Sequence, residues 1–172
     1  MAKVWNVLAA AASACALLGG CAMTPLPASD SAPPALTWQV RGTETGNTVT
    51  VWNKRPEYSA RNDEALYVTL RADDAGGVQR IQLAGVGDIT CAPLPNGNAI
   101  GGTVDIAAQT QTLSPNAQGF VLTSIFLTGW YNVTDTCVSD APLQQYTVHL
   151  TGVAEDFHGN KTTEHLVLVW ER

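Results

Sequence analysis

Four acidic residues and one asparagine in two glycine-rich, turn-like segments are the side chains of this sequence best suited to chemistry. They are Asp73, Asp74, Glu155, Asp156 and Asn160. Carboxylate and amide oxygens are the ligands that Ca²⁺ takes from proteins, about six to eight of them. Asp and Asn also favour turns for a local reason, because their side chains bond to the nearby backbone. We keep both interpretations, a calcium site and ordinary turns, and expect no other cofactor.

The sequence carries no pattern typical of a catalytic site. Gly-x-Ser-x-Gly, His-Glu-x-x-His and a phosphate-binding glycine loop between a strand and a helix are absent. Residues 96–102 are rich in glycine, which is typical of a flexible turn. His149 and His165 are candidates for an outward-facing metal pair, but two imidazoles without a third ligand bind metal weakly. We therefore expect a protein that is not an enzyme.

The larger aromatic residues divide into a core group and one candidate surface. In a sheet, tryptophans at alternating positions fill the interior, and we assign most of this group to the core. Trp130-Tyr131 is the exception, because it follows Gly129 and precedes a long loop-like segment. We interpret Trp130 and Tyr131 as a candidate surface for a protein or glycan partner.

Alternation of apolar and polar residues predicts that the domain is all-β. The alternation is clearest at residues 66–72 and in the last twenty-seven residues, where two strands flank a turn. No stretch after residue 35 carries the helical period over ten or more residues. A change of parity between Val78 and Ile81 predicts a bulge near Gln79-Arg80. Seven or eight short strands with turns between them are typical of a β-sandwich.

Two segments resemble parts of bacterial immunoglobulin-like domains. Residues 66–83, LYVTLRADDAGGVQRIQL, and residues 146–160, YTVHLTGVAEDFHGN, are similar to the B–C and F–G segments of that family. The resemblance implies a single immunoglobulin-like β-sandwich in which these two loops lie at the same end. It would thereby bring the acidic residues of both turns together. Residues 88–102 and 131–142 exceed the family's minimal pattern, and we interpret them as two inserted loops.

Cys91 and Cys137 lie inside those two segments, and we expect a disulfide between them. The signal segment described next places the chain in a compartment that permits disulfides. The alternative is a pair of free thiols or metal ligands, but no other residues with metal-ligand spacing lie near either cysteine in the sequence.

The first twenty residues are typical of a secretory signal peptide. Lys3 gives a positive start, and residues 4–18 are almost entirely small and apolar, too short to span a bilayer comfortably. Leu18-Gly19-Gly20-Cys21 resembles the lipobox of bacterial lipoproteins. The resemblance implies cleavage before Cys21 and attachment of acyl chains, palmitate among them, to this residue. Ala22, in place of the Asp that retains lipoproteins at the inner membrane, implies the outer membrane.

Residues 21–35 are rich in Pro, Ala and Ser and predict a tether, followed by one domain over residues 36–172. Loss of Lys3 leaves 8 Lys and Arg against 15 Asp and Glu, a net charge of −7. This balance disfavours nucleic acid and anionic lipid head groups, which leaves the acyl chains as the membrane contact.

Two classes of function remain open for such a protein. The first is a non-enzymatic binding, adhesion or scaffold module held at the cell envelope. The second is an inhibitor or accessory subunit of an envelope enzyme, or an enzyme with a loop-borne site. A fold alone decides neither.

Overall fold

A computed structural model describes residues 29–43, 48–51, 57–60, 64–93, 101–114, 120–127, 137 and 143–171. Within these ranges the chain forms nine strands and no helix: β1 (Ala35–Gly42), β2 (Thr48–Val51), β3 (Glu57–Ala60), β4 (Leu66–Asp73), β5 (Val78–Cys91), β6 (Gly102–Thr112), β7 (Phe120–Leu127), β8 (Leu143–Asp156) and β9 (Lys161–Glu171). The described part of the chain thus offers no helix long and apolar enough to cross a membrane.

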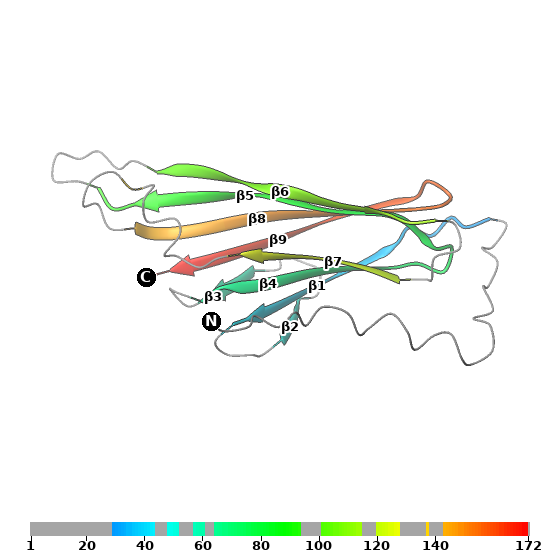
Figure 1. The fold of residues 1–172 in the computed structure, drawn as a ribbon, viewed down its shortest axis with the longest axis horizontal. Coiled ribbons are helices and arrows are strands. Elements are labelled where there is room, and N and C mark those ends of the chain that lie inside the picture. The colour runs from blue at the N-terminus through cyan, green and yellow to red at the C-terminus, as the bar shows by residue number, and fades with distance from the viewer. Residues whose placement is uncertain are drawn as a thin grey trace, which may run out of the picture.

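The strands form two sheets packed face to face, so the predicted all-β sandwich is confirmed. One sheet has four strands in the order β2-β1-β4-β7, and the other has five in the order β3-β9-β8-β5-β6. Figure 1 shows β6, β5, β8 and β9 side by side above the layer that contains β7, β4 and β1. Every pairing within the sheets is antiparallel except that of β3 with β9.

The core lies between the sheets and follows from the alternation in the sequence. In β4 every second residue is buried, from Leu66 to Ala72, and β8 shows the same period. Trp38 and Trp170 are fully buried, which confirms two of the tryptophans assigned to the core. The indole N–H of Trp170 donates to the carbonyl oxygen of Glu64 at 2.9 Å. Trp52, Trp130 and Tyr131 lie outside the described residues.

The predicted inserted loop at residues 88–102 is partly wrong, because β5 continues to Cys91. Two glycines of β5, Gly85 and Gly87, meet a packing demand. A Cβ at Gly85 would lie 2.6 Å from a methyl carbon of Leu150, and one at Gly87 would lie 2.8 Å from the ring of Tyr146. The absence of a side chain at these two positions therefore lets large side chains of β8 lie close to the backbone of β5.

Strand β3 and the end of the tether also differ from expectation. Residues 57–60, to which the sequence analysis assigned no strand, pair in parallel with β9. The segment before residue 36 is not all tether, because Asn160 Nδ2 donates to the Asp30 carbonyl at 2.9 Å and the Thr162 hydroxyl donates to the Pro34 carbonyl at 2.5 Å. These contacts start the folded domain about six residues earlier than predicted.

The bulge and the disulfide are where the sequence places them. The register between β5 and β8 shifts between Val78 and Arg80. Cys91 and Cys137 form a disulfide, with Cα atoms 5.8 Å apart. Cys91 ends β5 and is buried, so the bridge attaches the chain around residue 137 to the core at the end of the sandwich opposite the β8–β9 turn.

Candidate functional site

The side chains best placed for binding lie on the outward-facing side of the four-stranded sheet, which we call the outer face. Antiparallel register aligns residues of β1, β4 and β7 in rows across this face. One row is Arg41, Tyr67 and Phe126, and the next is Gln39, Thr69 and Ser124. An aromatic and cationic row therefore lies beside a polar row.

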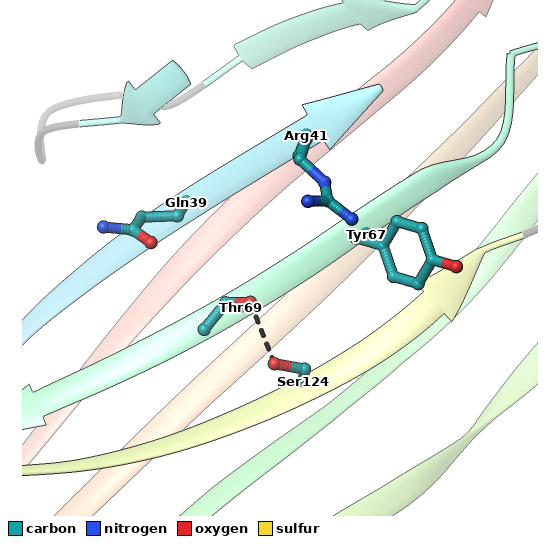
Figure 2. Close-up of a pocket in the computed structure, with 5 residues that line it drawn as sticks. All are labelled: Gln39, Arg41, Tyr67, Thr69 and Ser124. Atoms are coloured by element: carbon teal, nitrogen blue, oxygen red, sulfur yellow. Dashed lines mark hydrogen bonds between the residues drawn. The ribbon is translucent and has the colours of Figure 1, made fainter. Parts of the chain in front are cut away.

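The two rows enclose a shallow pocket of about 290 Å³. The Arg41 guanidinium carbon lies 5.0 Å above the Tyr67 ring, and the Tyr67 and Phe126 rings are tilted with centroids 4.7 Å apart. The hydroxyl groups of Thr69 and Ser124 bond to each other at 2.8 Å. Figure 2 shows the side chains that line the pocket rising from three neighbouring strands, with Arg41 beside Tyr67 and Thr69 bonded to Ser124. The pocket offers a stacked cation, an aromatic surface and hydroxyl groups to a ligand.

The outer face is also unusually apolar for a surface in contact with water. Four large apolar side chains on it are between 42% and 50% exposed: Tyr67, Phe120, Leu122 and Phe126. The Arg71 guanidinium covers the Phe120 ring at 4.6 Å while bonding Asp73 at 2.5 and 2.7 Å. Exposed apolar side chains that gather on one face are typical of interaction sites, whereas single ones are ordinary.

A cluster of three carboxylates lies at the end of the sandwich where β1 begins. One oxygen each from Asp30, Asp74 and Asp156 lies within 4.8 Å of the other two. Asp74 and Asp156 are buried, and Asp30 is half-buried. Figure 1 shows the blue segment before β1 reaching the same end as the turn between β8 and β9. The sequence missed Asp30, because nothing in a Pro/Ala/Ser-rich segment indicates that one carboxylate folds back.

Local hydrogen bonds hold these carboxylates in place. Asp74 Oδ1 accepts from the Gly76 N–H at 2.6 Å. Asp156 accepts from the backbone N–H groups of His158 and Asn160 and from the Asn160 amide, all at 2.7 to 2.8 Å. Turn formation thus explains much of why these residues stand here.

The electrostatic environments of the two buried carboxylates differ. Burial raises the pKa of Asp74, and the neighbouring charges of Asp30 and Asp156 raise it further, while backbone N–H donors oppose the shift. Burial also raises the pKa of Asp156, but the hydrogen bonds from Asn160 and His158 outweigh it and leave the pKa below its ordinary value. The cluster therefore favours a proton or a cation beside Asp74.

Only part of the predicted ligand set meets. Asp74 and Asp156 come together, and Asn160 turns its amide N–H toward Asp156, which is the donor side and not the ligand oxygen. Asp73 instead pairs with Arg71, and Glu155 pairs with Arg80 at 2.9 Å and Lys161 at 3.4 Å. Basic side chains on the same strand or on neighbouring strands satisfy these two carboxylates, a competition that the residue types did not reveal.

The two histidines occupy diagonal positions on β8 and β9. His149 lies opposite Val167 and 3.4 Å from Asp88, while His165 lies opposite Thr151 and bonds its hydroxyl. Each imidazole thus has a polar neighbour of its own, and the two histidines are not directly opposite each other across β8 and β9. Cys21 lies outside the described residues.

Calcium at the acidic cluster stays a prediction, and thermal melting of the full chain tests it. We expect millimolar Ca²⁺ to raise the melting temperature at pH 7 by several degrees, since an ion at ten times its dissociation constant adds about 1.4 kcal/mol. The matched variant Asp74→Asn keeps an oxygen for the Gly76 N–H but removes a charge, so it should lose this response. An unshifted parent would leave the cluster as turns alone.

The same variant tests the pKa of Asp74 without calcium. A raised pKa in the folded state means that protonation stabilises the fold, and that this stabilisation is lost as pH rises through the folded pKa. Asp74→Asn should therefore melt above the parent at pH 7, and the difference should shrink as pH falls below that pKa. A constant difference at all pH values would contradict the assigned shift.

No protein-family model matches the sequence. No curated protein matches it either. Among solved structures, the sporulation control protein Spo0M from Bacillus subtilis matches with 12% identity and a TM-score of 0.36, over 80% of this chain and 50% of that one. A DUF4466 family protein from Parabacteroides merdae matches with 6% identity and a TM-score of 0.37, over 78% and 44%. The chain thus spans about half the length of the structures it matches.

Proposed function

We propose that this protein is an envelope-anchored, non-enzymatic binding module, an outer-membrane lipoprotein whose sandwich binds a partner through the outer face. The observation that carries the proposal is the apolar character of that face, with Tyr67, Phe120, Leu122 and Phe126 about half exposed. Water contact with so much clustered apolar surface is unfavourable, and a partner that covers the surface removes that cost.

The strand order supports an immunoglobulin-like description of the module. Strands β9, β8 and β5 stand in one sheet in the order of G, F and C, and β1, β4 and β7 stand in the other in the order of A, B and E. Domains of this architecture host many functions. The outer face, and not the fold, therefore carries the functional argument.

A charge introduced on the outer face tests the proposal. Leu122→Lys places a cation in the centre of the apolar surface, and Thr163→Lys places the same charge at an exposed position on β9 of the other sheet. We expect the parent and Thr163→Lys to retain the same envelope partners after crosslinking in cells, as identified by mass spectrometry, and Leu122→Lys to lose them. Equal partner sets for all three proteins would contradict the outer face as the binding surface.

A further inference from the structure

The edge strands on the two sides of the sandwich differ greatly in length. On one side the sheets end in β2 and β3, which are four residues each. On the other side they end in β6 and β7, which are eleven and eight residues long. Short edge strands protect a sheet against pairing with another chain, and long ones do not. The unprotected backbone edges thus lie together on one side.

Strand β7 lacks the usual protection of an edge. Its sequence, FVLTSIFL, holds no charged residue, no proline and no glycine, and it is apolar on both faces. Its inner side is buried through Val121, Ile125 and Leu127, and its outer side exposes three large apolar side chains. One edge of β7 pairs with β4, and no described residue pairs with the other. Within the described part of the chain, this edge therefore presents N–H and C=O groups that no strand pairs with, and a further strand would satisfy them.

The opposite sheet extends past β7. β7 packs against both β5 and β6, so β6 lies partly beyond it. Val104 of β6 stands opposite Gly87, which faces the buried Tyr146 ring, so Val104 points toward the interior. It is nevertheless 37% exposed, and Ile106 on the same side is only partly buried. The overhang of β6 leaves an apolar ledge where the four-stranded sheet lacks a fifth strand.

We propose that an extended segment of a partner polypeptide binds along the free edge of β7 and becomes the fifth strand of this sheet. The segment pairs its backbone with β7, covers Val104 and Ile106 with alternate apolar side chains, and places the others beside Phe120, Leu122 and Phe126. This mode rests on the proposed function and names the kind of partner. The unpaired backbone requires an extended chain, and the ledge gives that chain an inner surface to cover.

A second copy of the chain fits this edge less well than a single segment. A two-fold axis beside β7 would pair the two copies of β7, and each copy would bring its own β6 over the same position. The space under the overhang of β6 has room for one added strand, but in such a dimer two overhangs would compete for it. We therefore assign the edge to a partner segment, and the mass of the protein in solution reports on the alternative.

Backbone methylation of a bound peptide tests strand addition directly. The probe is a set of twelve-residue peptides selected from an unbiased display library against the full chain, purified in detergent as the cell produces it. Methylating single amide nitrogens should weaken binding about tenfold at every second position, where the N–H faces β7, and little at the positions between. Equal effects at all positions would overturn strand addition and leave the outer face as a side-chain site.

A matched pair of variants locates the bound peptide. Val104→Arg fills the ledge, while Thr103→Arg places the same side chain on the exposed side of the same strand. We expect about tenfold weaker binding for the first and parent affinity for the second. If Leu122→Lys loses binding while Val104→Arg binds like the parent, strand addition at the edge of β7 is overturned and the outer face remains the binding surface. Binding that survives both variants, or a solution mass of two chains that blocks selection of any peptide, would overturn it as well.

Discussion

Replacing Cys21 with alanine should move the protein out of the membrane fraction almost completely. The lipobox resemblance of Leu18-Gly19-Gly20-Cys21 implies that this sulfur is the attachment point of the acyl chains, and each buried CH₂ group contributes about 0.8 kcal/mol to membrane binding. With a net charge of −7 the mature chain has no attraction to anionic head groups that could replace them.

Fractionation of cells that produce the parent, Cys21→Ala and Cys15→Ala measures the effect. Cys15→Ala serves as the control, because it removes the other cysteine of the signal segment and should leave the protein in the outer membrane. Mass spectrometry of the parent should show acyl chains on a mature chain that begins at Cys21. Membrane partition unchanged by Cys21→Ala would show that the anchor lies elsewhere.

Loss of the Cys91–Cys137 disulfide should lower stability by about 4 kcal/mol, the largest change that we expect from any two side chains. The bridge closes a loop of 46 residues, and the chain-entropy model relates that length to this magnitude. For a domain of this size the loss corresponds to a fall of roughly 10 to 15 °C in the melting temperature. Buried Cys91 leaves a small cavity as well when truncated.

Melting of the oxidised parent, the reduced parent and the Cys91→Ala/Cys137→Ala variant separates the two contributions. Reduction removes the cross-link and keeps the sulfur atoms, whereas the double variant removes both. Alkylation of the unreduced, denatured chain should leave Cys91 and Cys137 unmodified. Two labelled cysteines, or a melting temperature that reduction does not change, would contradict a stabilising bridge.

The sequence predicted those features of the fold that depend on local periodicity. Alternation along residues 66–72 and 146–154 located β4 and β8, and a parity change located the bulge beside Arg80. The disulfide was predicted from the secretory signal, which implies a compartment that permits disulfides, and from the two cysteines, Cys91 and Cys137, that follow the lipobox. The strand and bulge signals can be read from the sequence because each depends on residues close together in the chain, whereas the disulfide needed only the pairing of the two remaining cysteines.

Features that depend on contacts between residues far apart in the sequence could not be predicted in the same way. The packing role of Gly85 and Gly87 is one example, because the side chains that require them, Leu150 and Tyr146, lie some sixty residues away. Asp30 resembled tether for the same reason, since its neighbour Asn160 lies 130 residues along the chain. The apolar outer face did leave a signal in the sequence, because the β7 segment FVLTSIFL is apolar at both parities.

The contacts of Asp30 and Pro34 give the molecule a direction relative to its anchor. Nine residues separate Cys21 from Asp30, and a fully extended chain of that length spans at most about 30 Å. If Cys21 is lipidated as we propose, the end that carries the acidic cluster is tethered within that distance of the bilayer, and the disulfide lies at the opposite end of the sandwich. The edge of β7 runs along the length of the sandwich, between these two ends. A partner strand would reach that edge from the side, without having to pass beneath the domain.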